Sequence, residues 1–437
     1  MKTEIGVGLI GFGTVGTGVA RVLLENADLI RRRVGVPIKL VRIADLDITR
    51  DRGVAIPPGV MTTDIQQVLT DPRVDIVIEL MGGYDLAKRV ILDAVQRGKH
   101  VVTANKALLA VHGEEIFAAA SRQGIDLGFE ASVGGGIPVI RALTEGLAAN
   151  NIQSIYGIIN GTSNYILSRM TSEGQRFDVV LEEAKRAGYA EADPTFDVAG
   201  IDSAHKLTIM VSLAYGTPVN FKEIYTEGIT GLTPLDIAYA KEFGFTIKLL
   251  AIAKFSDGEI EARVHPTMVP SASQIAKVDG VYNAIQLVGD AVEDVVLYGR
   301  GAGSMPTGSA VVSDVMSIAR DMLKNASGRV PPASYQPDQR RPLRMRPMEE
   351  ITSLYYIRFM VLDRPGVLSQ IAGVLGRYGI SISSVLQQGR KEGQTVPVVI
   401  MTHMAKERDI QNALREINPM PYISEPTTLI RVEGRDE

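Results

Sequence analysis

The chain opens on a short apolar strand that runs directly into a glycine-rich turn and then into a helical pattern. The strand covers residues 5–10, and the turn reads Gly11-Phe12-Gly13-Thr14-Val15-Gly16. Between a strand and a helix, the first glycine makes the tight turn, the second lets backbone approach a pyrophosphate, and the third allows close packing of helix on strand. The helix N-terminus then offers unpaired N–H groups and a partial positive charge to phosphate. The arrangement predicts a nicotinamide dinucleotide site.

The first 130 residues alternate strands and helices as a doubly wound α/β domain requires. We expect strands at 5–10, 38–44, 74–80, 100–103 and 125–130, and helices around 14–30, 64–70, 86–97 and 113–122. This order predicts a Rossmann-type parallel sheet. The second strand ends at Asp45, where such folds place an acid that accepts hydrogen bonds from the adenosine ribose. An acid there repels a 2′-phosphate and favours NAD over NADP, although Arg42 and Arg50 lie close enough in sequence to reach a phosphate instead.

Composition excludes several classes of protein. A length of 437 residues suggests about three domains, and a net charge of −4 argues against a broad nucleic-acid surface. No apolar run reaches membrane-spanning length, and no signal peptide pattern is present, so we expect a cytoplasmic protein. The chain has no cysteine, which excludes disulfides, thiolate metal sites and any aldehyde dehydrogenase that works through a cysteine thiohemiacetal.

Two more strands end in small polar turns. Met81 and Gly82 follow the strand at 74–80, while Thr103 ends the next strand and Lys106 comes soon after it. Both turns fall at the carboxyl ends of parallel strands, where open α/β sheets bind their ligands. A cation is unfavourable near a helix start, so we expect Lys106 to meet an anion or to have a chemical task.

The loop at residues 130–138 contains three consecutive glycines and then a proline, which neither strand nor helix interior tolerates well. Its exposed carbonyls could line a substrate cleft, coordinate a hard cation or form a hinge between domains, and the residues alone leave these three open. A similar turn, Asn160-Gly161-Thr162-Ser163, follows the apolar strand at 155–159. For that turn an ordinary helix cap is the alternative.

The densest chemistry lies at residues 189–206, just before an apolar helix at 207–215. The segment contains four carboxylates, those of Glu191, Asp193, Asp197 and Asp202, and ends in His205 and Lys206. Asp202 and Lys206 stand four residues apart, which makes them neighbours on one helical face. On a surface such a pair contributes only about 0.3–0.5 kcal/mol. A helix this apolar is expected to be buried, however, so its charged end is expected to line a cleft.

Taken together, the motifs resemble homoserine dehydrogenase. Five segments carry the resemblance, in this order: GFGTVG, TANKALLA, EASVGGGIP, INGTSNYIL and YAEADPTFDVAGIDSAHKL. They lie within residues 5 to 325, and five motifs in register are far more specific than any one of them. The resemblance implies reversible interconversion of L-aspartate 4-semialdehyde and L-homoserine, a step of threonine, methionine and isoleucine biosynthesis, with hydride passing to or from a nicotinamide.

The resemblance also implies roles for individual residues. Lys206 matches the family's catalytic lysine, which exchanges a proton with the substrate oxygen. Lys106 would sit beside it, and two ammonium groups in one cleft lower each other's pKa. Substrate binding is implied for Thr162, Tyr189, Glu191, Asp197 and Asp202. Cofactor contacts are implied for Gly11, Phe12, Gly13, Thr14, Val15, Gly16, Asp45, Met81, Gly82, Thr103, Lys106 and, in a late glycine-rich turn, Gly303.

Two further implications concern ligands. The backbone around Glu130, Val133, Gly135 and Ile137 matches the family's monovalent cation site, usually sodium. Many relatives carry an arginine just before the aspartate at the end of the second strand, where this chain has Ala44. That departure strengthens the expectation of NAD.

The C-terminal part begins with a Pro/Arg-rich linker at 326–351, whose arginines we expect to be solvated. Beyond it, 352–432 predicts a βαββαβ unit, with strands at 353–361, 380–387, 396–401 and 427–432 and helices at 365–378 and 406–417. The segment LDRPGVL at 362–368 resembles an ACT domain, an amino-acid-binding regulatory module. The resemblance implies L-threonine as the effector; a plain dimerisation module is the alternative.

The expected organisation is a Rossmann domain over 1–133, a substrate and dimerisation domain over 134–325 whose end returns to the cofactor domain, the linker and the ACT domain. We expect a monofunctional homodimer or homotetramer, without a fused aspartate kinase, that binds small molecules and neither nucleic acid nor membrane. The alternatives are another amino-acid or semialdehyde oxidoreductase on this fold, or a catalytically silent NAD-binding amino-acid sensor. The presence of Lys106, Lys206 and Glu191 argues against the sensor.

Overall fold

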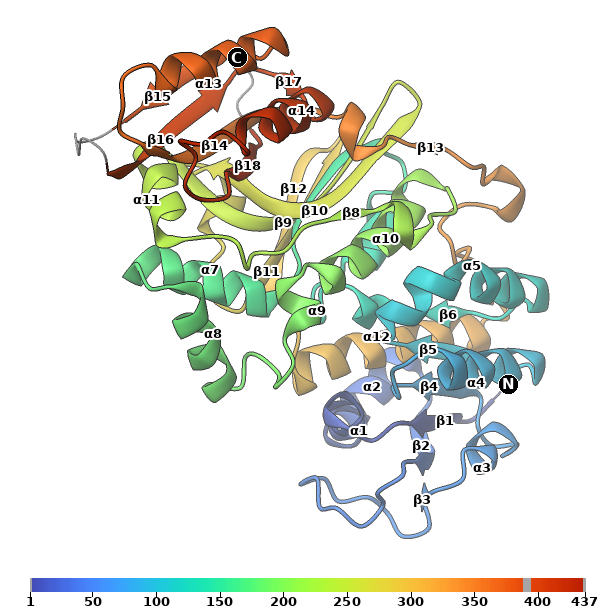
Figure 1. Cartoon of the computed structure of the whole chain (residues 1–437). Coiled ribbons are helices and arrows are strands. Elements are labelled where there is room, and N and C mark those ends of the chain that lie inside the picture. The colour runs from blue at the N-terminus through green and yellow to red at the C-terminus, as the bar shows by residue number, and fades with distance from the viewer. Residues whose placement is uncertain (1, 388–393, 435–437) are drawn as a thin grey trace. The chain divides into compact units, whose positions relative to one another are not determined.

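The computed structural model describes residues 2–387 and 394–434, and Figure 1 labels its helices and strands. The chain divides into two compact units. The first unit holds Met1–Gly161, Asp202–Ile224 and Val281–Leu343, and the second unit holds Thr162–Ile201, Tyr225–Gly280 and Arg344–Glu437. No described helix is long and apolar enough to cross a membrane.

A six-stranded parallel sheet, in the order β3-β2-β1-β4-β5-β6, forms the N-terminal part of the first unit. Its strands are β1 (Ile5–Ile10), β2 (Ile38–Ala44), β3 (Met61–Thr62), β4 (Ile76–Glu79), β5 (His100–Thr103) and β6 (Leu127–Gly128). Every residue of β1 is buried, as expected of a parallel strand covered on both faces. The predicted Rossmann-type sheet is confirmed. The short β3 was missed because two residues carry no periodic signal.

The helices of this part are α1 (Thr14–Glu25), α2 (Ala27–Val34), α3 (Gln66–Leu69), α4 (Asp85–Gln96) and α5 (Lys106–Gln123). The predicted helix at 14–30 is in fact two helices that break at Asn26, whose N–H closes α1 on the Val22 carbonyl. The helix predicted at 113–122 already begins at Lys106. The Asn105 side chain caps it there by accepting a hydrogen bond from the Leu108 N–H.

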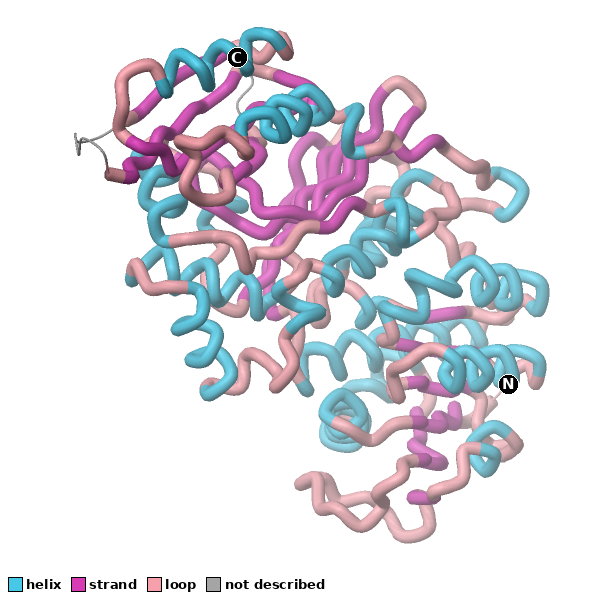
Figure 2. The backbone as a smooth tube through the Cα atoms, viewed as in Figure 1, coloured by secondary structure: helices cyan, strands magenta, loops and turns pink. Residues whose placement is uncertain are grey.

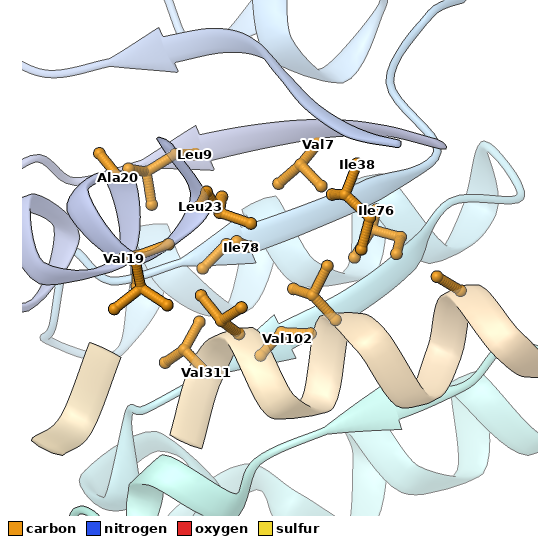
Figure 3. Packing of buried hydrophobic residues seen from close by; sticks show 14 of the residues in the cluster. Val7, Leu9, Val19, Ala20, Leu23, Ile38, Ile76, Ile78, Val102 and Val311 are labelled. Atoms are coloured by element: carbon orange, nitrogen blue, oxygen red, sulfur yellow. The ribbon is translucent and has the colours of Figure 1, made fainter. Parts of the chain in front are cut away.

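A late helix, α12 (Ser304–Leu323), packs against α1 and the parallel sheet. Figure 3 shows Val311 of α12 beside Val19 of α1 and Val102 of β5, all buried in one apolar cluster. The two helices cross so closely that a Cβ added at Gly18 would lie 2.1 Å from the Ser304 carbonyl oxygen. The turn before α12 is thereby held against the start of α1.

The rest of the first unit contains an antiparallel group of strands, β12-β11-β7, with β7 (Ile152–Ile158), β11 (Tyr282–Gly289) and β12 (Glu293–Arg300). The apolar helix predicted at 207–215 is α10 (Ile201–Tyr215), and every residue from Asp202 to Ala214 is buried. The short elements are η1 (Glu130–Ser132), α6 (Val139–Arg141), η2 (Ala142–Gly146), η3 (Phe221–Glu223) and η5 (Pro337–Gln339).

The second unit is built on the long antiparallel pair β9 (Phe245–Ser256) and β10 (Glu259–Pro270), which run side by side in Figure 2. The short strands β8 (Tyr225–Thr226) and β13 (Arg344–Met345) pair with β10. Its helices are α7 (Gly161–Glu173, of which Gly161 belongs to the first unit), α8 (Phe177–Arg186), α9 (Thr195–Val198) and α11 (Pro234–Glu242), with the turns η4 (Ile275–Lys277) and η6 (Met348–Glu350).

The C-terminal part of the second unit has the predicted βαββαβ order. Its main elements are β14 (Thr352–Leu362), α13 (Val367–Arg377), β15 (Ile382–Leu386), β16 (Thr395–Thr402), α14 (Glu407–Ile417) and β18 (Thr428–Val432), with a small β17 (Ala405–Lys406) beside β14. The antiparallel order β18-β14-β16-β15 is that of an ACT fold. This part also continues the sheet of the unit, because β18 pairs in parallel with β10.

The expectation that the linker arginines are solvated is wrong for Arg340 and Arg346, whose side chains are 12% and 18% exposed, whereas Arg344 is 49% exposed. Arg340 forms a two-pronged pair with Glu114, Nη1 and Nη2 each lying 2.7 Å from a carboxylate oxygen. Arg344 and Arg346 pair with Glu259, and Arg346 pairs also with Glu261. Arg344 also pairs with Glu350 inside the linker. The acids that Arg340 and Arg346 meet lie far away in sequence, so the local Pro/Arg pattern contains no signal for them.

Candidate active site

Two lysine ammonium groups of the first unit meet on the carboxylate of Asp202. Lys206 Nζ donates a hydrogen bond to Asp202 Oδ2 at 2.6 Å, and Lys106 Nζ lies 3.2 Å from Asp202 Oδ1. Asn160 Nδ2 donates to the same carboxylate at 2.9 Å, and Lys206 Nζ also donates to the Ile159 carbonyl oxygen at 2.6 Å. The site thus joins the start of α5, the first turns of α10 and the segment that follows β7.

Burial determines what each charge in this cluster can do. The Asp202 side chain is 8% exposed, that of Lys206 10% and that of Lys106 42%. Burial raises the pKa of Asp202, but Lys206 and Lys106 outweigh it and hold the pKa well below its usual range. Asp202 therefore stays ionised and fixes both ammonium groups. Asp202 is the anion that we expected beside Lys106, because a cation at a helix start is otherwise unfavourable.

His205 precedes Lys206 but has a separate role. Its ring stacks on Phe221, with 4.4 Å between ring centroids, and burial lowers the pKa of its imidazole. It packs as a core residue of α10.

The glycine-rich turn after β1 fits a dinucleotide pyrophosphate. Gly11 has a φ of 96°, which favours glycine, and a Cβ at Gly16 would lie 2.2 Å from the Gly11 carbonyl oxygen. Gly13 is open, since an added Cβ there meets no described atom within 4 Å. The first turn of α1 carries no acidic residue that would repel phosphate. The backbone can therefore approach an anion at the helix start.

At the end of β2, three residues hold the Asp45 carboxylate, and one of them is Asp47, whose N–H donates to Oδ1 at 3.0 Å. Asp45 Oδ2 accepts from the Phe12 N–H at 2.6 Å, and Asp45 Oδ1 lies 3.0 Å from Arg52 Nη2. The Arg52 guanidinium also lies over the Phe12 ring, 5.0 Å from its centroid. Arg42 instead pairs with Asp71, and the Arg50 side chain is exposed. Sequence reasoning named Arg42 and Arg50 and missed Arg52, the arginine that reaches this acid.

Glu79 connects the two turns at the ends of β4 and β5. Its side chain is fully buried and accepts from the Met81 N–H at 2.8 Å, the Gly82 N–H at 3.3 Å and the Thr103 hydroxyl at 2.7 Å. Burial raises the pKa of Glu79, although each of these donors favours the charged form. Sequence reasoning missed this residue too, and the available signal was one acid inside an otherwise apolar strand end.

The late glycine-rich turn reaches the start of α1. Gly303 caps the N-terminus of α12 with a φ of 121°. The next residue, Ser304, donates from its hydroxyl to the Thr14 carbonyl oxygen at 2.7 Å. The turn that contains Gly303 therefore lies beside the glycine-rich turn at 11–16, although the two are almost 300 residues apart in sequence.

In the triple-glycine loop, two of the predicted carbonyl ligands already accept a hydrogen bond from the described chain, and two do not. The Ile137 carbonyl accepts from the Val139 N–H at 2.9 Å and that of Glu130 from the Val133 N–H at 3.4 Å. Within residues 2–387 and 394–434, no protein donor reaches the carbonyls of Val133 or Gly135. No cluster of three His, Cys, Asp or Glu side chains suited to a metal occurs in the described chain, so the predicted cation site depends on these carbonyls.

The remaining predicted substrate residues lie in the second unit. The Thr162 hydroxyl donates to the Tyr189 carbonyl oxygen at 2.6 Å, and the Ser163 hydroxyl donates to that of Asp197 at 2.9 Å. Both contacts gather around the start of α7. Glu191 is exposed. The structure therefore groups Thr162, Tyr189 and Asp197 in one unit, and Asp202 with the two lysines in the other.

Comparisons with known proteins agree on one family. A family model described as homoserine dehydrogenase matches residues 138–316, the NAD binding domain of that family matches 11–130, and an ACT domain model matches 355–420. The homoserine dehydrogenase of Neisseria gonorrhoeae is 47% identical over 430 residues, which cover 98% of this chain and 99% of that protein. The homoserine dehydrogenase of Pseudomonas aeruginosa is 47% identical over 428 residues, 98% of each chain. The crystal structure of a homoserine dehydrogenase from Thiobacillus denitrificans superposes with a TM-score of 0.93 at 47% identity, covering 98% of both chains.

Proposed function

The chain belongs to the homoserine dehydrogenase family, and from that premise we propose how its residues divide the work of the reaction. It is an NAD(P)-dependent oxidoreductase that acts on a CH–OH group and interconverts L-aspartate 4-semialdehyde and L-homoserine. The observation that carries the proposal is the pair of ammonium groups on the buried carboxylate of Asp202, with 2.6 Å to Lys206 and 3.2 Å to Lys106. Such a cluster can both supply a proton and stabilise negative charge.

Lys206 is the proton-transfer group in this proposal. When bound, the nicotinamide supplies or accepts the hydride. Lys206 gives a proton to the substrate oxygen as the aldehyde is reduced, and takes it from the hydroxyl in the reverse direction. Asp202 and the Ile159 carbonyl hold its ammonium group, each at 2.6 Å. Lys106, the more exposed cation, stabilises the developing charge on the same oxygen.

The amino-acid end of the substrate is held by the other predicted residues. Glu191 and Asp197 attract its ammonium group together with Asp202, while Thr162 and Tyr189 fix its position. The hydrogen bond from Thr162 to the Tyr189 carbonyl supports this grouping, because it ties the two segments together.

For the cofactor, we propose NAD as the preferred dinucleotide. The pyrophosphate lies against the turn at 11–16, and the nicotinamide half passes Met81, Gly82, Thr103, Lys106 and Gly303. Asp45, which the Phe12 N–H holds in place, accepts from the ribose hydroxyls and repels a 2′-phosphate. A monovalent cation, sodium, binds the carbonyls of Glu130, Val133, Gly135 and Ile137. The carbonyls of Val133 and Gly135 support that site, because both residues are buried and no donor from the described chain reaches these oxygens.

The proposed domain boundaries are those expected from the sequence: cofactor domain 1–133, substrate and dimerisation domain 134–325, linker 326–351 and ACT domain 352–432. The ACT fold implies an amino-acid effector, and we propose L-threonine, bound at the loop that follows β14. We also propose a homodimer or homotetramer, the assembly in which paired ACT domains can share an effector.

A direct assay tests the function. The absorbance of reduced nicotinamide is followed with L-homoserine and NAD or NADP in parallel, with and without L-threonine. We expect homoserine-dependent reduction that is faster with NAD and slower in the presence of threonine. Absence of reduction with either cofactor, in protein shown to bind NAD, would replace this proposal by another semialdehyde substrate or by the silent sensor.

A further inference from the structure

Asn283, on β11 in the first unit, carries a buried side-chain amide that the proposed mechanism does not use. The residue is 1% exposed, and its Oδ1 has no hydrogen-bond partner among the described residues. Buried polar atoms are nearly always hydrogen-bonded, because leaving one unpaired loses its bonds to water without replacement. The unpaired Oδ1 therefore indicates a donor that comes from outside the protein chain.

On one side Asn283 is a close neighbour of the proton-transfer lysine. In the antiparallel pairing of β11 with β7, Ala284 stands opposite Ile158, so Asn283 is level with Ile159. The Ile159 carbonyl accepts the hydrogen bond from Lys206 Nζ at 2.6 Å. Residues opposite each other in such a pair are about 4.5–5.5 Å apart at Cα. Asn283 thus lies one strand spacing from the carbonyl that holds Lys206.

On the other side Asn283 touches the turn that leads to α12. A Cβ added at Gly301 would lie 1.9 Å from Asn283 Nδ2, so only a glycine allows this contact. Two residues later Gly303 caps α12, and Ser304 bonds to the Thr14 carbonyl at the start of α1. The start of α1 is the end of the site that suits a pyrophosphate. Asn283 therefore lies between the phosphate end of the cofactor site and the lysine at its reacting end.

We propose that Asn283 Oδ1 accepts a hydrogen bond from the carboxamide NH₂ of the bound nicotinamide ring. The part of a dinucleotide between its pyrophosphate and its reacting carbon is the nicotinamide riboside, and the carboxamide sits on the ring carbon next to the reacting one. A bond to this group fixes the rotation of the ring and presents its reacting carbon on the side of Lys206. The inference rests on the nicotinamide site of the proposed function and adds a residue that orients the ring.

The test compares two cofactors by calorimetric titration of the full-length protein without substrate. NADH carries the carboxamide, and the reduced 3-acetylpyridine analogue keeps the ring carbonyl but has a methyl group where the NH₂ would be. We expect the wild-type protein to bind NADH about fivefold to tenfold more tightly, the effect of one net hydrogen bond. In Asn283→Leu the two dissociation constants should become equal within about twofold. Asn283→Asp keeps an acceptor oxygen and should keep the preference.

Asn164→Ala is the matched control. Asn164 is also a buried asparagine, but its amide donates to the Val278 and Gly280 carbonyls, so its loss should affect thermal stability and leave the preference for NADH intact. Equal binding of both cofactors by the wild-type protein, or a preference that survives in Asn283→Leu, overturns the inference. If Asn283→Leu does not fold, the inference is tested by the ratio of the two dissociation constants in the wild-type protein and in Asn283→Asp.

The same titrations distinguish two other outcomes, absence of a dinucleotide site and a cation bound to Asn283 Oδ1. If the chain does not use a nicotinamide dinucleotide at all, the wild-type protein binds neither NADH nor its analogue, whereas failure of the homoserine reaction alone leaves both dissociation constants measurable. If Oδ1 is instead a cation ligand, exchange of sodium for choline weakens NADH binding in the wild-type protein but not in Asn283→Leu, and the ratio between the two cofactors does not change with the variant. That result also overturns the inference.

Discussion

At the scale of single residues, the candidate site depends on opposite charges that are buried together. Asp202 is 8% exposed and Lys206 10%, so neither can be stabilised by bulk water. Removing one member of such a buried pair leaves the other uncompensated and costs about 3–5 kcal/mol, against about 0–1 kcal/mol for a surface pair. The contact between Asp202 and Lys206 therefore has two effects: it orients Lys206 for catalysis, and it stabilises the fold. Variants at this cluster need a readout for each.

Lys206→Ala separates binding from chemistry. We expect the dissociation constant for NADH to stay within about twofold, because the pyrophosphate turn is untouched, while kcat falls by about 10²–10⁴-fold, the usual contribution of a positioned acid or base. Calorimetric titration and initial rates measure the two quantities, and a thermal melt confirms folding. Lys39→Ala is the control, since Lys39 is an exposed lysine whose partner is Glu4. Unchanged turnover in Lys206→Ala would remove the assigned role.

Asp45→Ser tests the choice of cofactor. Loss of the carboxylate removes the repulsion of a 2′-phosphate and frees Arg52, now 3.0 Å from Asp45 Oδ1, to bind that phosphate. We expect the ratio of kcat/KM for NAD to that for NADP to fall by about tenfold or more, equivalent to about 1.4 kcal/mol. The double variant Asp45→Ser with Arg52→Ala should lose the gain for NADP. An unchanged kcat/KM ratio in Asp45→Ser would show that Asp45 does not determine the choice between NAD and NADP.

These residues also mark where sequence reasoning succeeds and where it stops. Asp45 and Lys106 could be chosen because each follows a strand at the ligand-binding end of a parallel sheet. Arg52, Glu79 and Asn283 could not, since their importance depends on partners brought near by folding. Only Glu79 left a local trace, as an acid at the end of a buried strand.

At the scale of elements, the two lysines stand near the starts of two helices that the linker fastens together. Lys106 begins α5 and Lys206 lies in the first turns of α10. Later along both helices, Arg340 bridges Glu114 of α5, at 2.7 Å, and Ser212 of α10, at 3.0 Å. The linker thus joins the two helices beyond the turns that present the two ammonium groups, near the middle of α5 and in the second half of α10.

Arg340→Ala should loosen this arrangement. The Arg340 side chain is 12% exposed and Glu114 46%, so we expect a stability loss of about 1–3 kcal/mol, near the lower end because of solvent screening. We also expect kcat/KM to fall several-fold with less change in NADH affinity. Arg341→Ala, which removes the same charge from an exposed neighbour, is the control. Equal effects of the two variants would mean that charge, and not the bridge between helices, is responsible.

Elements were predicted well where their pattern is long and poorly where it is short or set by partners. β1, β2 and β5 match their expected bounds because an apolar run between turns defines each strand. The break at Asn26 and the two-residue β3 were missed. Arg340 and Arg346 were misjudged because a proline-rich segment gives no information about the distant acids that its arginines will meet.

At the scale of the whole molecule, the chain crosses between the two units after residues 161, 201, 224, 280 and 343. A sequence read in consecutive blocks cannot show such interleaving. The ACT part is the clearest case, because it was expected as a module behind a linker. Within the second unit it is joined to β10 by strand pairing and by a buried network of charges around Arg431. Deleting it would expose the edge of β10 and leave Arg263 without its partner Glu433, so point variants are the better test of regulation.

Arg431→Met is the point variant that probes this joint. Arg431 is 2% exposed; its Nη1 lies 2.6 Å from Glu227 Oε2 and its Nη2 2.5 Å from Glu407 Oε1, so the arginine links α14 to the segment after β8. Loss of the arginine leaves the Glu407 carboxylate buried without a cation, and we expect the second unit to lose about 3–5 kcal/mol in denaturant unfolding. Adding Glu407→Leu should recover part of that loss, because no uncompensated charge then remains at that position. Arg408→Met, at an exposed neighbour paired with Glu349, should change little.

The same two variants test regulation. If an effector bound to the ACT part acts through this joint, Arg431→Met weakens threonine inhibition while the rate without threonine stays near that of Arg408→Met. Intact inhibition in a destabilised Arg431→Met protein would show that the network stabilises the fold without transmitting the signal.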